Sequence, residues 1–441
     1  MAPMSAAHRL VFIVVALLVV VAVAVVALGV GDPGGGIGAG PSETPSTEAS
    51  ASPSSDPPSA SASADPSAPS EAEAQAILDE IEEQVIAIRG LEAADIGPAD
   101  IITRAELAGE LQQIFDAEYP PEEREQDNLA LRALGLLESD EDIAELQLQL
   151  LGDQVLGFYD DVERRMVVVS DAGLDIEARI TYAHEYTHAL QDATYGLDSL
   201  ETDADGEDDR GLARTALIEG DATVTMLSWM LQNLSQDELF EYFNSAQVPD
   251  TTGIPSWMVA QLAFPYDAGL TWTTALAGGD PTSPDFTRID AAYDDPPDST
   301  EQIIDIEKWD PRETPDAVEV PDLAEALGDG WEEVDSTPIG QATIAIMLEF
   351  FGVSAPDAQD AADGWGGDRA VIATGPDDAF AVAWRVAFDT SDDADAFLAA
   401  YETAVDGLDF PASVAELPSG EILVAHASTD ALLAQTIDAA D

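Results

Sequence analysis

The residues best suited to chemistry in this sequence form one short run, HEYTH, from His184 to His188. On a helix, side chains four positions apart lie on one face roughly 6 Å apart, so both imidazoles can reach one tetrahedral Zn²⁺. Glu185 would then lie beside the open coordination position and could take a proton from water. With four histidines in 441 residues, this pattern rarely arises by chance. The alternative is a pair of ordinary helix histidines beside a solvated glutamate.

A zinc site of this type needs a third protein ligand, and the sequence has no cysteine to supply it. Glu219 is the strongest candidate, because its segment RTALIEGDATVTMLSWM is apolar and a carboxylate on such a helix face needs a cation as partner. Asp221 lies on another face of that helix, so we expect it only to cap or support. The alternatives are His426, in the expected strand EILVAHAS, and the acids of the 198–209 loop.

Two more residues are candidates for supporting roles. Asp192 follows His188 by one turn, where it could accept a hydrogen bond from a ligand imidazole. Tyr266 follows Pro265, which is expected to interrupt an apolar helix, and its hydroxyl could donate to the oxyanion of a tetrahedral intermediate.

An acidic segment, ETDADGEDDR, separates the two candidate metal helices. Its first positions match a calcium-binding EF-hand loop, but Leu212 occupies the twelfth position, where a bidentate glutamate is required. We therefore expect a solvated acidic loop here, with a calcium site as the alternative.

Hydrophobic periodicity predicts the elements that position these residues. Two period-two runs, 154–160 and 165–170, predict a β-hairpin, and a helix over 175–194 follows with HEYTH on it. The strand Met166–Val169 is expected to bind an extended peptide by strand addition. Before the hairpin, residues 71–151 form an expected helical region, in which Thr103 and Glu106 make a capping-box pattern.

The C-terminal residues 366–441 alternate between strand and helix patterns and predict a small two-layer α/β module of ferredoxin-like type. The fold class expected for the whole chain is α+β, mostly helical. Its central part would be residues 152–365.

The N-terminal residues predict a membrane anchor. Residues 10–30 form an uncharged apolar run long enough to span a bilayer, and Arg9 before it predicts that residues 1–9 are cytoplasmic. Residues 31–70 are rich in Pro, Ser, Gly and Ala and predict a disordered linker. The expected location is the cell membrane, single-pass, with the rest of the chain extracytoplasmic; the alternative is a cleaved signal peptide and secretion.

The charge balance excludes one class of partner. The 88 Asp and Glu residues against 15 Lys and Arg give a net charge of -73. Nucleic-acid binding needs a basic surface that neutralises phosphates, so nucleic acid is not expected as a partner.

Together, the segments GFYD, HEYTHALQD and ALIEGDA resemble gluzincin-type zinc metallopeptidases, and in particular membrane-anchored metallopeptidases of bacteria. PPDSTEQII and GWGGDR are similar to segments of the same group, so the resemblance extends from about residue 75 to about residue 400. It implies a zincin-like core, a Zn²⁺ cofactor held by His184, His188 and Glu219, and Glu185 as the catalytic base.

The function expected from these observations is hydrolysis of a peptide or protein substrate by a membrane-anchored extracytoplasmic zinc peptidase. The alternative is a catalytically inactive zincin-fold protein that serves as a cell-envelope binding or scaffold protein. The intact Glu185 argues against the alternative, because a scaffold has no use for a catalytic base.

Overall fold

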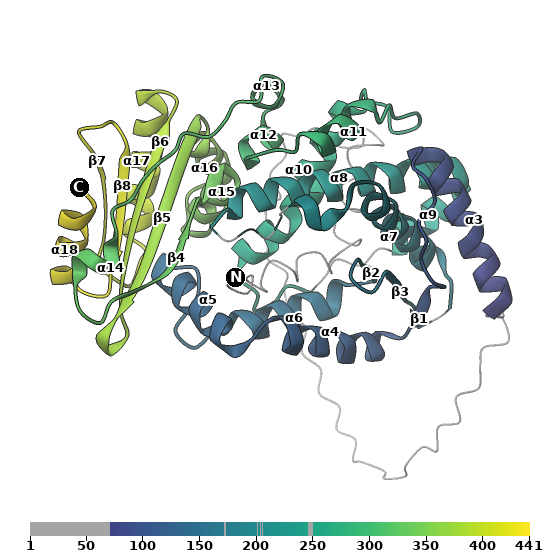
Figure 1. The fold of residues 1–441 in the computed structure, drawn as a ribbon, viewed down its shortest axis with the longest axis horizontal. Coiled ribbons are helices and arrows are strands. Elements are labelled where there is room, and N and C mark those ends of the chain that lie inside the picture. The colour runs from purple at the N-terminus through teal and green to yellow at the C-terminus, as the bar shows by residue number, and fades with distance from the viewer. Residues whose placement is uncertain (1–70, 172, 201, 203, 205, 246–249) are drawn as a thin grey trace, which may run out of the picture.

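The computed structural model describes residues 71–441 except 172, 201, 203, 205 and 246–249. The chain has an α+β fold in which helices predominate (Figure 1). The expected anchor at 10–30 and linker at 31–70 lie outside the described residues. Within the described ranges, no helix combines the length and the apolar character needed to cross a bilayer.

The helical N-terminal region agrees with the sequence expectation. The predicted capping box forms at Thr103, whose side chain accepts from the Glu106 amide while the Glu106 side chain accepts from the Thr103 amide. The helix before it packs against the central helices α7 and α8. The helices of this region are α3 (Glu71–Arg89), α4 (Arg104–Glu118), α5 (Pro121–Leu134) and α6 (Ile143–Gln154).

The expected hairpin belongs to a sheet of three strands in the order β1-β3-β2. These strands are β1 (Asp100–Ile102), β2 (Gly157–Asp160) and β3 (Arg165–Val169). The middle strand β3 pairs with β1 in parallel and with β2 in antiparallel orientation. The prediction that Met166–Val169 binds a peptide by strand addition is therefore wrong, because both edges of that strand are already paired.

Three long helices form the centre of the molecule: α7 (Ile176–Tyr195), α8 (Asp208–Asn233) and α10 (Ser256–Leu276). The side chain of Asp175 accepts from the Ala178 amide and caps α7. Pro265 lies inside α10, so the proline does not interrupt this helix as expected. Shorter helices surround the three: α9 (Gln236–Ser245), α11 (Thr287–Asp294), α12 (Thr300–Ile304), α13 (Ile306–Trp309), α15 (Gly340–Phe350), α16 (Ala355–Ala362) and the 3₁₀ helix η2 (Leu197–Leu200).

The C-terminal part is an antiparallel sheet of five strands in the order β4-β5-β6-β8-β7. The strands are β4 (Glu332–Thr337), β5 (Trp365–Gly375), β6 (Ala379–Phe388), β7 (Ala412–Glu416) and β8 (Ile422–Ala427). The sheet thus begins more than thirty residues before the expected module boundary at 366.

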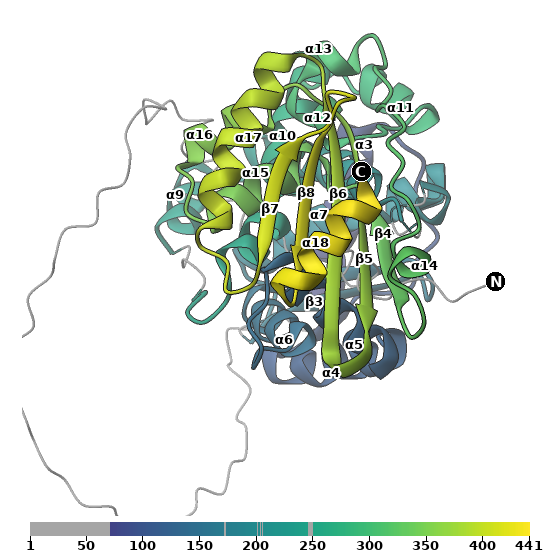
Figure 2. The same ribbon diagram turned by 90° about the vertical axis from the view of Figure 1, so that its left-hand side faces the viewer.

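The two faces of this sheet are covered by different helices. Trp384 on β6 packs against Phe397 of α17 (Ser391–Val405), on the face turned to the main core. Its neighbour Ala383 belongs to a separate cluster with residues of α14 (Leu323–Leu327) and α18 (Asp430–Ala440). Figure 2 shows α18 crossing the face opposite to α15. The ferredoxin-like two-layer expectation is therefore wrong, because that arrangement places both helices on one face.

The GWGGDR segment connects this sheet to the start of helix α15. The buried carboxylate of Asp368 accepts from the indole Nε1 of Trp365 at 2.9 Å and of Trp384 at 2.6 Å. It also accepts from the amides of Ile339 and Gly340 at the start of α15. Four donors satisfy this buried charge, so the segment has a structural role.

Candidate metal centre

Helices α7 and α8 bring three ligand-type side chains together in the interior. His184 and His188 lie one turn apart on α7, and Glu219 faces them from α8. Glu219 Oε2 lies 3.1 Å from His184 Nε2 and 3.4 Å from His188 Nε2, and the two Nε2 atoms are 3.1 Å apart. Among the described residues, no other group of His, Asp and Glu converges in this way.

The spacing of these three atoms fits a metal ion. In a tetrahedral zinc site with bonds of about 2.0–2.1 Å, neighbouring ligand atoms lie about 3.3 Å apart. Two imidazoles and one carboxylate are also the ligand set of zinc sites that keep a fourth position for water or substrate. The three groups could therefore hold a metal ion, which is the coarser part of the sequence prediction.

Without a metal, the same groups stabilise one another as charges. Burial raises the pKa of Glu219, but the nearby imidazoles of His188 and His184 outweigh it and hold the pKa below its usual range. Burial lowers the pKa of His188, but the nearby carboxylate of Glu219 outweighs burial and the pKa lies above its usual range. A bound cation would replace the imidazolium as the partner of this carboxylate.

Glu185 lies beside the three ligand groups, and a strand holds it there. Its carboxylate accepts a hydrogen bond from the backbone amide of Tyr159 on β2 and feels the charges of His184 and Glu219. Burial is the largest influence and raises the pKa of Glu185. A Cβ on Gly157 would lie 2.7 Å from the Thr181 methyl and 3.6 Å from Glu185 Cγ, so only glycine lets β2 approach α7 this closely.

Tyr266 lies on the other side of the centre, on α10. Its ring centroid is 6.2 Å from that of His184, and its hydroxyl donates a hydrogen bond to Glu219. Burial and the nearby carboxylates of Glu219 and Glu185 raise the pKa of Tyr266 well above 10, so the hydroxyl is a donor at neutral pH. The structure thus brings this residue to the site, as the sequence analysis expected.

The whole centre is closed to solvent. The exposed fraction is 1% for His184, 4% for Glu185, 8% for His188 and 2% for Glu219. All four side chains are therefore buried in the interior.

The hydrogen-bond partner of the His188 imidazole is not Asp192, as the sequence analysis expected. His188 Nδ1 donates to Gln191 Oε1 at 2.8 Å, whereas Asp192 Oδ2 accepts from the Tyr159 hydroxyl at 3.1 Å. The expectation that Asp192 accepts a hydrogen bond from this imidazole is therefore wrong, and Gln191 takes that place. One signal in the sequence could have found Gln191: it lies three positions after His188, on the same helix face.

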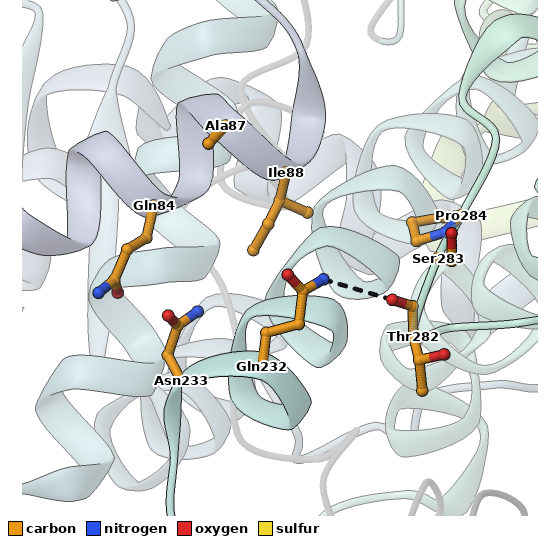
Figure 3. A pocket seen from close by; sticks show the side chains of 8 residues that line it. All are labelled: Gln84, Ala87, Ile88, Gln232, Asn233, Thr282, Ser283 and Pro284. Carbon is orange, nitrogen blue, oxygen red and sulfur yellow. Dashed lines mark hydrogen bonds between the residues drawn. The ribbon is translucent and has the colours of Figure 1, made fainter.

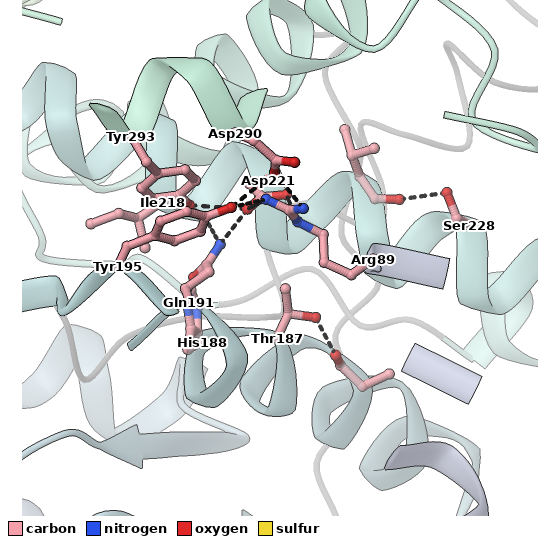
Figure 4. Close-up of polar contacts among 12 residues, drawn as sticks. Arg89, Thr187, His188, Gln191, Tyr195, Ile218, Asp221, Ser228, Asp290 and Tyr293 are labelled. Carbon is pink, nitrogen blue, oxygen red and sulfur yellow. Dashed lines mark hydrogen bonds and ion pairs between the residues drawn. The ribbon is translucent and has the colours of Figure 1, made fainter. Parts of the chain in front are cut away.

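Asp221 is not a ligand, in agreement with the sequence analysis, but it is more than a cap. Its carboxylate is completely buried and pairs with Arg89 of α3 (Figure 4). Gln191 Nε2 donates to the same carboxylate at 2.9 Å. Sequence reasoning missed Arg89, because its partner lies 132 positions away.

His426, the alternative third ligand, is buried in the C-terminal sheet. Its Nδ1 donates to the carbonyl of Ala133 at 3.0 Å, which leaves Nε2 to accept from the Tyr401 hydroxyl at 3.0 Å. Burial lowers the pKa of His426 to about 4. Both ring nitrogens are satisfied within the protein, so His426 is structural. The calcium alternative in the 198–209 loop rests on positions 201, 203 and 205, which lie outside the described residues.

A surface pocket of about 360 Å³ lies between α3 and the end of α8, away from the metal centre (Figure 3). Its lining is mostly amide and hydroxyl side chains, including Gln84, Gln232 and Thr282. None of the ligand-type residues lines it, so this pocket does not contribute to the chemistry of the centre.

A family model described as "Domain of unknown function (DUF8575)" matches residues 326–431, from α14 to the start of α18. No curated protein and no solved structure matches the chain. The matched residues thus cover the five strands of the sheet and the helices α15, α16 and α17, and His184, Glu185, His188 and Glu219 all precede them.

Proposed function

We propose that this protein is a zinc metallopeptidase, resembling the gluzincin group, that hydrolyses peptide bonds in a peptide or protein substrate. The observation that carries the proposal is the convergence of His184 Nε2, His188 Nε2 and Glu219 Oε2 in a buried site beside Glu185. Two ordinary helix histidines would not require a carboxylate from another helix at 3.1 Å.

In this proposal, His184, His188 and Glu219 hold the ion, which when bound acidifies a water molecule and polarises a carbonyl. Glu185 takes the proton from that water and passes it to the leaving amine. Burial raises the pKa of Glu185, which strengthens the carboxylate as a proton acceptor. The Tyr266 hydroxyl would turn its one hydrogen from Glu219 to the oxygen that gains charge.

The substrate backbone would lie along β2 rather than β3. In the three-stranded sheet, β2 is an outer strand, and its Tyr159 amide already contacts Glu185. An extended peptide paired with this strand would pass directly beside the base, with main-chain hydrogen bonds fixing its position. From the sequence alone, residues 10–30 would anchor the enzyme in the membrane with the peptidase part outside.

One observation favours the alternative of an inactive binding protein, namely the low solvent exposure of all four centre residues. An enzyme of this structure has to open for each turnover, whereas a scaffold does not. The two functions differ in the need for Glu185, since only the enzyme requires a base.

The test is hydrolysis of an unstructured peptide library by the purified full-length chain and by Glu185→Gln. The glutamine keeps the shape and the hydrogen-bonding capacity of the side chain, so we expect full zinc content and a loss of about 10²–10⁴-fold in kcat. An active Glu185→Gln protein, or a wild type that binds zinc and cleaves nothing, would exclude the proposed mechanism.

A further inference from the structure

A chain of buried polar groups connects α3 to His188 (Figure 4). It begins at Arg89, whose side chain is 0% exposed, at the end of α3. Arg89 Nε donates to Asp221 Oδ1 at 2.8 Å, and Arg89 Nη2 donates to Asp221 Oδ2 at 3.1 Å. A guanidinium that contacts both oxygens fixes the carboxylate in position and direction.

Further contacts hold both partners of this ion pair. The Tyr293 hydroxyl donates to Asp221 Oδ2 at 3.0 Å. Arg89 Nη1 lies 2.7 Å from Asp290, and its guanidinium carbon lies 4.5 Å from the centre of the Phe286 ring. The pair is therefore rigidly enclosed by α8, α11 and the residues that precede α11.

The next link in the chain is Gln191, whose amide can take only one orientation. Its Nε2 donates to the Ile218 carbonyl at 3.0 Å and to Asp221 Oδ2 at 2.9 Å. A backbone carbonyl and an ionised carboxylate only accept hydrogen bonds, so the NH₂ group must face them. The Oε1 atom is consequently turned toward His188.

This orientation determines which nitrogen of His188 carries hydrogen. Gln191 Oε1 is an acceptor and lies 2.8 Å from His188 Nδ1, so that nitrogen must be protonated. The lone pair needed for a metal bond is then on Nε2, the atom that faces His184 and Glu219. Gln191 thus links His188 to an ion pair that contacts neither His184 nor His188.

We propose that Arg89 is a positioning residue of the metal centre, acting through Asp221 and Gln191 to keep the hydrogen of His188 on Nδ1 and its Nε2 available to the metal. The proposal rests on the proposed function only in naming zinc as the metal. It also assigns a role to α3, because this helix supplies Arg89 to the centre.

If Arg89 had only a structural role, its substitution would lower stability without weakening zinc binding. Arg214 provides the matched control for such a role. Arg214 is also a buried arginine; it donates to the carbonyls of Leu200 and Pro297 and pairs with Asp298. Arg214→Met should therefore lower the free energy of unfolding, as Arg89→Met does, without weakening zinc binding.

The experiment uses the purified full-length chain and measures zinc affinity by competition with a chelator. We expect Gln191→Met and Arg89→Met to bind zinc about 10–100-fold more weakly than wild type, the range for loss of a group that supports a metal ligand. Arg214→Met should bind as tightly as wild type. If Arg89→Met does not fold, Arg89→Lys keeps the charge and loses the two-pronged contact, and should weaken zinc binding by an intermediate factor.

The proton NMR signal of His188 Nδ1–H gives a second readout that does not depend on catalysis. It should be sharp and slow to exchange in wild type and Arg214→Met, and broadened or lost in the Arg89 variants. Arg89 variants with wild-type zinc affinity and an unchanged Nδ1–H signal would overturn the inference while leaving the proposed function intact. A wild type that binds no zinc would instead contradict the proposed function, and the Nδ1–H signal of the metal-free protein would still decide the role of Arg89.

Discussion

Gly220 of α8 and Gly269 of α10 touch backbone to backbone: a Cβ on Gly220 would lie 2.4 Å from the Gly269 carbonyl oxygen. A Cβ on Gly269 would in turn lie 2.3 Å from the carbonyl of Ala216. Any side chain at either position would separate the two helices. This close crossing places Tyr266, one turn before Gly269, against Glu219.

The contact between Tyr266 and Glu219 leads to a prediction for Tyr266→Phe. The phenylalanine keeps the ring beside His184 and removes only the hydroxyl, so zinc content should stay near that of wild type. Loss of one donor to the developing negative charge should reduce kcat by about 10²–10³-fold with a smaller change in KM. Steady-state kinetics on a single peptide check this, and an unchanged kcat would remove Tyr266 from the mechanism.

Glu219→Gln should fail in a different way from Glu185→Gln, although the two substitutions are chemically the same. In the proposed site, Glu219 is the anionic ligand. The glutamine should therefore weaken zinc binding by more than the roughly 10–100-fold expected for a supporting group, and activity should fall as a consequence. Chelator competition and hydrolysis are measured on both variants. Full zinc and full activity in Glu219→Gln would place the third ligand elsewhere.

His426 predicts part of the pH dependence of stability. Its pKa is about 4 in the folded protein, against about 6.5 for an ordinary histidine, because burial disfavours the charged ring. The neutral ring therefore stabilises the fold above pH ~6.5, and this contribution, up to ~3 kcal/mol, is lost as the pH falls through 4.

The check on His426 is the free energy of unfolding in urea at pH 7 and at pH 4.5 for wild type and His426→Gln. Carboxylates contribute equally to both proteins, so the difference between them isolates the histidine. Wild type should lose more stability than the variant on acidification. Equal losses would show that His426 does not resist protonation.

Topology gives a separate prediction. An anchor at residues 10–30 and an extracytoplasmic peptidase part require that protease treatment of intact cells releases a large fragment beginning within residues 31–70. Recovery of the untreated full-length protein from the cytosol would exclude the anchor.

The sequence predicted that His184, His188 and Glu219 come together, because each of them carries a local signal. HEYTH places two imidazoles on one helix face, and Glu219 is a charge in an apolar helix. Gln191 and Arg89 carry no such signal: an amide on a helix is ordinary, and the ion pair of Arg89 joins residues 132 positions apart.

The errors in the predicted fold have equally physical causes. β1 has only three residues, too few for an alternating pattern, so its pairing with β3 was not foreseen. In β6, both Ala383 and Trp384 are buried, on opposite faces. A strand that is apolar on both faces does not show which helix covers which side.

The most direct test of the account is metal analysis of the purified full-length protein beside its His184→Ala variant. His184 Nε2 lies 3.1 Å from both Glu219 Oε2 and His188 Nε2, so the alanine removes one of the three groups that could hold the ion. We predict close to one zinc ion per chain in wild type and almost none in His184→Ala, with hydrolysis only in the former. Absence of zinc from both, or equal zinc in both, would contradict the assignment of this site.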